Sequence, residues 1–99
     1  MEKEIKLKSE EALDYIKKNV ENYDVLEISY NRIFVPGEVL DIEVNHEEDE
    51  KSMILLLKLT GELLNSTVQI DLEEIKEDIL EIRHITGKES TLIVVEPEI

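Results

Sequence analysis

The chain has 99 residues, of which 41 % are apolar, and its 25 acidic and 11 basic residues give a formal net charge of −14. This length predicts a single domain over residues 1–99. The absence of Cys excludes disulfides, thiolate nucleophiles and Cys-ligated zinc. Such an acidic surface repels phosphate backbones and attracts basic partners, so we expect no direct binding of nucleic acid.

The sequence contains no long apolar segment. Its longest apolar run, Met53–Leu57, is far shorter than a membrane span, and the residues that follow Met1 are charged. We therefore expect a cytoplasmic protein that makes no contact with a membrane.

The first third of the chain predicts a short strand followed by a helix. Ile5 and Leu7 alternate with lysines, which favours a strand. Ser9 is a candidate N-cap for a helix over about residues 9–22, because its hydroxyl can accept a free backbone N–H. The apolar stripe of this helix is Leu13, Ile16 and Val20.

The middle of the chain has the two-residue period of strands. Alternation begins at Val25, and Pro36-Gly37 is typical of a type II turn before a second, half-buried strand over residues 40–44. Residues 53–60 are apolar on both faces, which predicts a central strand covered on one side by the first helix. Short strands are also expected at residues 67–70 and 92–95.

Residues 72–85 fit two structures. As a helix, the segment has an N-cap at Asp71 and an apolar stripe that ends near Gly87. As part of a barrel, it forms a single turn over residues 72–76 and then a strand in which Leu80 and Ile82 alternate with charged residues. The two alternatives stay open at this point.

Two stretches carry resemblances to known families. Residues 68–75 (VQIDLEEI), followed by 79–82 (ILEI), resemble the strand, single turn and last strand of SH3-like and Sm-like small barrels. Residues 24–32 (DVLEISYNR), with 36–39 (PGEV), look like a family of small uncharacterised proteins of methanogenic archaea. Neither resemblance assigns a catalytic residue. The RNA binding usual for Sm-like proteins conflicts with the acidity of this chain.

These observations predict the α+β class, with the N-terminal helix packed on an antiparallel sheet. We prefer closure into an SH3-like or Sm-like barrel. The alternative is an open antiparallel sheet with a second helix at about residues 72–85.

Residues with catalytic or metal-binding chemistry are few. The segment 46–52 (HEEDEKS) gathers carboxylates, but its spacing is not that of a calcium loop, and we interpret it as a solvated turn. His46 and His84 are the only histidines, and we expect both at the surface or at a strand edge. We therefore predict no catalytic, cofactor or metal site.

The function that these features favour is a non-catalytic interaction module that binds a basic protein or a second copy of itself. Acidic residues outnumber basic ones most strongly after residue 60. The predicted interaction surface consists of Glu73, Glu74, Glu77, Asp78, Glu81, Leu63 and Leu64. Two alternatives are an acidic mimic of nucleic acid, which occupies the basic groove of a DNA- or RNA-binding protein, and a small metal-dependent enzyme.

Overall fold

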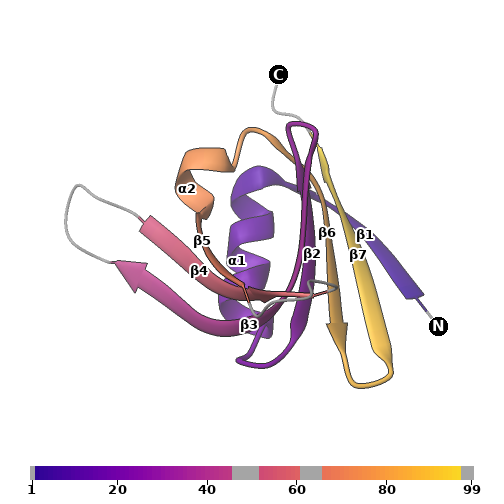
Figure 1. Cartoon of the computed structure of the whole chain (residues 1–99). Helices are drawn as coiled ribbons and strands as arrows, with labels where there is room; N and C mark the ends of the chain where they lie inside the picture. The colour runs from indigo at the N-terminus through magenta and orange to yellow at the C-terminus, as the bar shows by residue number, and fades with distance from the viewer. Residues whose placement is uncertain (1, 46–51, 61–65, 97–99) are drawn as a thin grey trace.

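The structure, a computed structural model, describes residues 2–45, 52–60 and 66–96. These residues form one sheet of seven strands and two short helices (Figure 1). In chain order the elements are β1 (Glu2–Lys8), α1 (Ser9–Asn19), β2 (Val25–Tyr30), β3 (Ile33–Asn45), β4 (Ser52–Leu59), β5 (Thr67–Asp71), α2 (Leu72–Ile75), β6 (Ile79–Thr86) and β7 (Glu89–Glu96).

The sheet is open. Its strand order is β1-β7-β6-β2-β3-β4-β5, and β1 and β5 form its two ends without pairing with each other in the described residues. The α+β class is therefore confirmed in its coarse form, as a sheet-rich domain with two short helices, whereas the predicted closure into a barrel is wrong. The sheet is also not fully antiparallel, because β1 runs parallel to β7.

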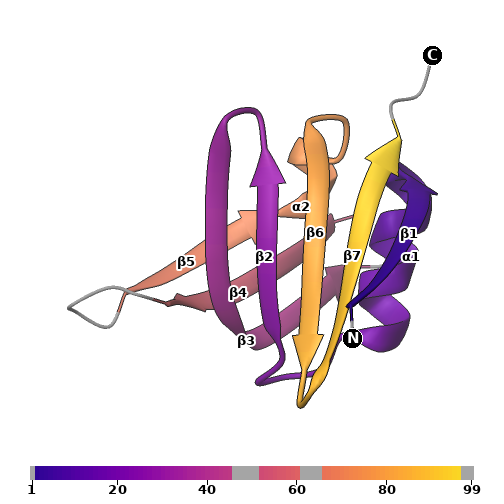
Figure 2. The same cartoon turned by 90° about the vertical axis from the view of Figure 1, so that its right-hand side faces the viewer.

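The position of α1 accounts for the open sheet. Figures 1 and 2 show α1 on the concave side of the bent sheet, between β4 and β5 on one side and β6 and β7 on the other. Ala12 and Ile16 are fully buried there. The 13-residue strand β3 changes register against β4 between Val39 and Asp41. Such a register change bends a strand, and the bend carries β4 and β5 around the helix.

The core between helix and sheet is aliphatic. Residues that share burial and mutual contact come from α1, α2 and every strand from β2 to β7. The largest fully buried side chains are Ile16, Leu26, Ile28, Leu55, Leu57, Leu72, Ile82, Ile93 and Val39. As predicted, β4 is an interior strand of the sheet, between β3 and β5.

The hairpin between β2 and β3 turns earlier than predicted. Asn31 and Arg32 connect the strands, and both have positive φ angles, 40° and 67°. Positive φ at both central residues is typical of the type I′ turn that suits two-residue hairpins. The predicted turn at Pro36-Gly37 is wrong, because both residues lie inside β3, where Gly37 pairs with Leu26 and Leu59.

The ambiguous segment forms a turn and a strand. Asp71 caps α2 by accepting the N–H of Glu73 at 3.0 Å, but the helix ends at Ile75 and β6 begins at Ile79. The alternative with a second helix over 72–85 is therefore wrong. A register shift between Ser29 and Tyr30 of β2 explains the double periodicity, because such a bulge lets Ile79 and Ile82 both face the core although they are three residues apart.

The start of α1 also differs from the prediction. Ser9 is the first helical residue and not the N-cap, which is Lys8. The backbone N–H of Lys8 donates to the Glu11 carboxylate at 3.0 Å. The helix ends at Asn19, because the backbone of Val20 is extended.

Candidate interaction surface

The structure divides the predicted interaction surface between two places. Glu73 and Glu74 lie on α2, Glu77 and Asp78 lie in the turn after it, and all but the half-buried Glu73 are exposed. Glu81 is exposed on β6 and lies in a different shallow hollow. Leu63 and Leu64 lie outside the described residues.

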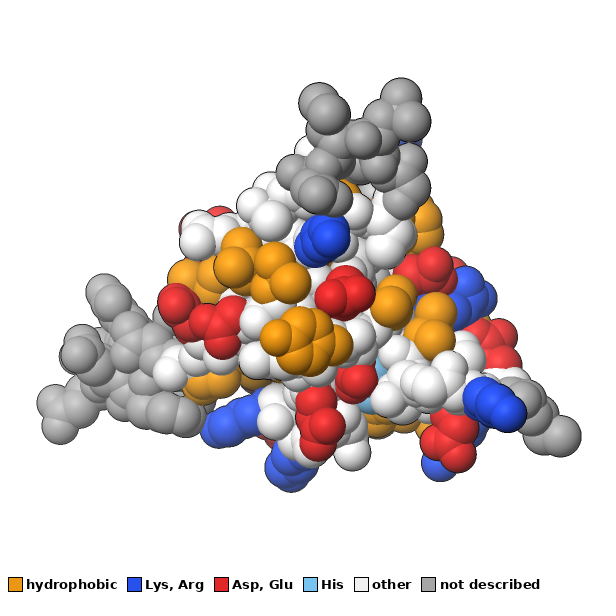
Figure 3. All heavy atoms as spheres, turned by 60° about the horizontal axis from the view of Figure 1, so that its bottom comes forward, with side chains coloured by type: hydrophobic (Ala, Val, Ile, Leu, Met, Phe, Trp, Pro, Cys, Tyr) orange, Lys and Arg blue, Asp and Glu red, His pale blue; other side chains and the backbone are white. Residues whose placement is uncertain are grey.

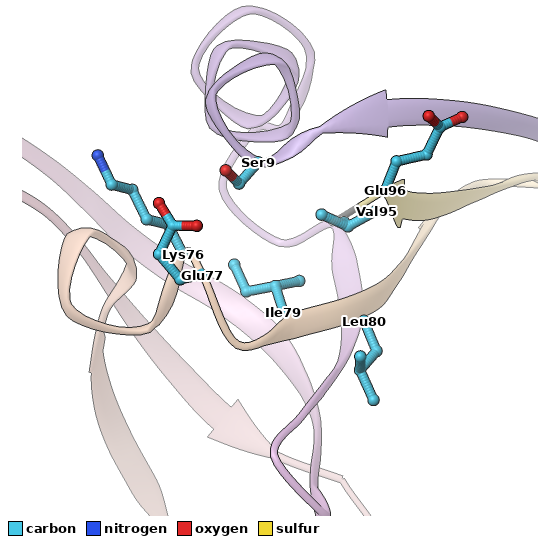
Figure 4. A pocket seen from close by; sticks show the side chains of 7 residues that line it. All are labelled: Ser9, Lys76, Glu77, Ile79, Leu80, Val95 and Glu96. Atoms are coloured by element: carbon cyan, nitrogen blue, oxygen red, sulfur yellow. The ribbon is translucent and has the colours of Figure 1, made fainter. Parts of the chain in front are cut away.

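A hollow of about 100 Å³ lies beside α2, where the start of α1 meets the ends of β6 and β7. Ile79, Leu80 and Val95 supply its aliphatic lining. Figure 4 shows Glu77 and Glu96 on opposite sides of this hollow. We call this place the α2 hollow. Its lining residues are Ser9, Lys76, Glu77, Ile79, Leu80, Val95 and Glu96.

The one cation that lines the α2 hollow is neutralised by other residues. Lys76 forms ion pairs with Glu10 and with Glu73, the latter at 3.3 Å. The hydrogen bonds to Glu10 and then Glu73 raise the pKa of Lys76 above its ordinary value. Glu77 and Glu96 have no ion pair with any cation of the described residues, so the hollow keeps a net negative charge.

Ser9 adds a buried polar atom to the same hollow. Its side chain is at the first residue of α1, the residue is only 2 % exposed, and its Oγ has no hydrogen-bond partner within the described part of the chain. A buried hydroxyl without a partner carries a free-energy cost. This atom is therefore available to a group that enters the hollow.

Glu81 lies in the same hollow as Arg83 and apart from the acidic residues on and after α2. The second hollow, of about 40 Å³, is on the outer side of the sheet and is lined by Phe34, Glu81 and Arg83 among others. The Arg83 guanidinium donates to Glu2 at 2.6 Å and to Glu27 at 3.0 Å. The hydrogen bond from Arg83 holds the pKa of Glu2 below its ordinary value.

Several large apolar side chains are exposed. Tyr23 is 74 % exposed, Phe34 59 %, Leu80 57 % and Ile33 48 %. Figure 3 shows one face of the molecule on which hydrophobic side chains lie among acidic ones. Leu80 is the exposed apolar residue that belongs to the α2 hollow.

His84 is part of a buried hydrogen-bonded chain that the sequence analysis missed. It is 4 % exposed and lies on β6, an interior strand, so its predicted place at the surface or at a strand edge is wrong. Its Nε2 lies 2.8 Å from the Asp24 carboxylate and its Nδ1 2.8 Å from the Tyr15 hydroxyl. A neutral ring that donates from Nε2 and accepts at Nδ1 satisfies both contacts. The chain links α1, the following loop and β6, and no nucleophile takes part in it.

Comparison with known protein families places the chain in one of them. The model of a family described as uncharacterised protein conserved in archaea, DUF2097, matches residues 3–95. The chain belongs to this family. No curated protein and no solved structure matches the chain. The resemblance to a small archaeal family is thus confirmed.

The described residues of this DUF2097 member offer neither a metal site nor a membrane-spanning helix. Within residues 2–45, 52–60 and 66–96 there is no group of three or more His, Asp or Glu side chains arranged to hold a metal ion. The acidic segment 46–52, where carboxylates are densest, lies outside the described residues except for Ser52. Neither described helix has the length and apolar character needed to cross a membrane.

Proposed function

We propose that this protein is a non-catalytic interaction module that binds a basic protein partner through the α2 hollow. The observation that carries the proposal is the pair of unneutralised carboxylates, Glu77 and Glu96, on two sides of an aliphatic hollow (Figure 4). The protein acts in the cytoplasm, and its partner presents Lys or Arg side chains.

The lining of the hollow matches the chemistry of a long basic side chain. Lys and Arg bury their methylene stems against apolar surface and keep the charged head at a polar rim. Ile79, Leu80 and Val95 supply the apolar contact, and Glu77 and Glu96 supply the rim. The free Ser9 Oγ can accept one N–H of the bound cation.

The size of the hollow supports a side chain and not a metabolite as its occupant. Pockets for small-molecule ligands usually enclose about 300–1,000 Å³. The α2 hollow encloses about 100 Å³. This volume suits part of one side chain, and the remaining contact area would come from the surrounding surface, including Glu74 and Asp78.

The overall charge supports fast capture of a basic partner. A net charge of −14 attracts cationic proteins over a distance and raises the rate of encounter. The same field works against direct nucleic-acid binding, which depends on neutralising phosphates with basic residues.

The experiment captures partners from the lysate of an archaeal host that encodes this protein, and then measures association with each purified partner. We expect the on-rate to fall as salt rises, because exposed charges are screened beyond about 10 Å at 0.1 M ionic strength. At a given salt concentration, Glu77→Lys should have a lower on-rate than the wild type. Glu43→Lys makes the same charge change on β3, away from the hollow, and is the matched control.

The outcomes distinguish binding at the α2 hollow from a general effect of the negative net charge. A larger loss for Glu77→Lys than for Glu43→Lys supports the hollow. Equal losses would make the acidity a diffuse steering field, and a flat salt response with full binding by Glu77→Lys would remove the proposal. A stronger variant is the triple reversal of Glu73, Glu74 and Glu77 to Lys, which should lower the on-rate more than it raises the off-rate.

A further inference from the structure

Strand β1 forms one end of the sheet and has a free edge. It spans Glu2–Lys8 and pairs with β7 on one side, and no described strand pairs with its other side. Figure 2 shows β1 at the end of the sheet, with α1 behind it. An unpaired edge of this length presents backbone groups on which another strand can pair.

The two faces of β1 differ in a regular way. Ile5 and Leu7 point to the inner face, where they are half-buried and pack against the core. The opposite face carries exposed charged residues, two acidic ones followed by two basic ones. These residues are Glu2, Glu4, Lys6 and Lys8. Glu4 and Lys6 form no ion pair within the described residues.

A second copy that pairs with this edge across a two-fold axis must run antiparallel. The axis must also pass through one residue of the strand, because only then do directly opposite residues lie on the same face of the sheet in both copies. With the axis at Ile5, Glu4 lies opposite Lys6 of the second copy, and Glu2 lies opposite its Lys8. Ile5 then meets Ile5 on the inner face. Every charged pair on the outer face joins opposite signs.

All other positions of the axis bring like charges together. An axis at Lys3, Glu4 or Lys6 places that charged residue opposite itself. An axis at Leu7 places Lys6 opposite Lys8. Like charges directly opposite each other destabilise a strand pair, whereas opposite charges stabilise it. Charged side chains often protect edge strands from pairing with another chain. On β1, however, the register centred on Ile5 places no like charges opposite each other.

We propose that the protein forms a homodimer by antiparallel pairing of β1 with β1 of a second copy, in the register centred on Ile5. The pairing extends the sheet across both copies and buries Ile5 and Leu7 further. The other end strand, β5, is shorter and carries one charge, Asp71, which already caps α2. Its sequence therefore specifies no register by charge.

The net charge of each copy opposes dimerisation. Two chains of −14 repel each other at long range, but salt screens this repulsion beyond about 8 Å at physiological ionic strength. Opposite side chains on paired strands have Cβ atoms about 5 Å apart, within that distance. The dimer is therefore expected at physiological salt and should weaken at low salt.

The dimer goes beyond the proposed function and uses a different surface from the α2 hollow. Its test needs no partner protein, so its failure leaves the hollow untouched. Glu2 already bonds Arg83 and Ser90. The test therefore changes the charged pair nearer the two-fold axis, Glu4 and Lys6.

The experiment is sedimentation velocity over a concentration series at physiological salt. The wild type should shift from monomer to dimer mass, and Glu4→Lys or Lys6→Glu should each weaken dimerisation about tenfold, since each turns two opposite-charge pairs into like-charge pairs. The double variant, with both changes, should dimerise like the wild type. An equal mixture of the two single variants should form a heterodimer, because every pair then has opposite signs.

A cross-link tests the register. The chain has no Cys, so an Ile5→Cys variant can form a disulfide only with another copy. Under mild oxidation it should give a covalent dimer, whereas Leu7→Cys, which faces Lys3 of the second copy, should give far less. A monomeric wild type at every concentration, a dimer indifferent to both reversals, or equal cross-linking by the two cysteine variants would overturn the proposal.

Discussion

The imidazole of His84 lies 2.8 Å from the carboxylate of Asp24, and this contact fixes the loop after α1 to strand β6. Burial alone raises the pKa of Asp24. The hydrogen bonds from His84, from the backbone N–H of Glu21 and from Thr86 outweigh that effect and hold the pKa below its ordinary value. The loop is therefore anchored most firmly when Asp24 is ionised.

This anchor predicts a pH dependence of stability. Because the pKa of Asp24 is lower in the folded state than in the unfolded state, its contribution is complete above the unfolded value, 3.8, and is lost as the pH falls through the folded value. Asp24→Asn should cost about 1–3 kcal/mol near neutral pH. Urea denaturation across pH 2–6 should show a shallower acid loss for Asp24→Asn. An unchanged slope would mean that Asp24 is not the titrating group.

The Tyr15 hydroxyl gives a second prediction. Its ring meets His84 edge-on, with centroids 5.6 Å apart, and Tyr15→Phe keeps this contact while it leaves Nδ1 of His84 without its partner. A loss of about 1–3 kcal/mol is expected, as for other buried groups deprived of a hydrogen bond. Thermal denaturation measures it, with Tyr30→Phe as the control, since the Tyr30 hydroxyl has no partner in the described residues. Equal stability of the two variants would contradict the prediction.

Gly37 gives a third prediction because of its close contact with β4. A Cβ at this position would lie 3.0 Å from Cβ of Leu57 and 3.1 Å from the carbonyl oxygen of Lys58. Gly37→Ala should therefore destabilise the protein by about 1–3 kcal/mol through overpacking. Gly87→Ala is the comparison, because its Cβ would meet no atom within 4 Å and only its φ of 57° opposes the change. A harmless Gly37→Ala would mean that β3 and β4 separate easily here.

The strands of the fold could be predicted where one face is buried and the other is wet. Leu26 and Ile28 are fully buried on β2, while Glu27 and Ser29 are only half-buried, and the alternation of apolar and polar residues in the sequence indicates this difference. The neighbours of each strand could not be predicted in the same way. The parallel pairing of β1 with β7 joins Glu2 to Ser90, and no local signal links residues so far apart.

The candidate sites show the same division. The acidic residues around α2 were visible as composition, but their assembly with Ser9 and Val95 required the tertiary structure. The chain through His84 was missed because Tyr15 and Asp24 are 69 and 60 residues away from it in sequence. The sequence shows only one polar residue, His84, at a position of β6 that could face inward, and the same pattern is compatible with an exposed histidine.

The last prediction concerns the effect of Ser9→Ala on stability, for which the sequence pattern and the structure predict opposite signs. As an N-cap, Ser9 would stabilise α1, and Ser9→Ala would cost about 1 kcal/mol. In the structure Ser9 is the first helical residue, and its Oγ is buried without a partner in the described residues. Ser9→Ala removes an unsatisfied polar atom and replaces Ser by a better helix former.

We therefore expect Ser9→Ala to raise the free energy of unfolding by about 1 kcal/mol, measured by urea denaturation of the free protein. Ser9→Val fills the same place with a bulkier group and is the control for packing. If the hydroxyl serves a bound basic side chain, Ser9→Ala should also weaken binding of a captured partner while it stabilises the free protein. A loss of stability on Ser9→Ala would restore the capping role and remove this atom from the α2 hollow.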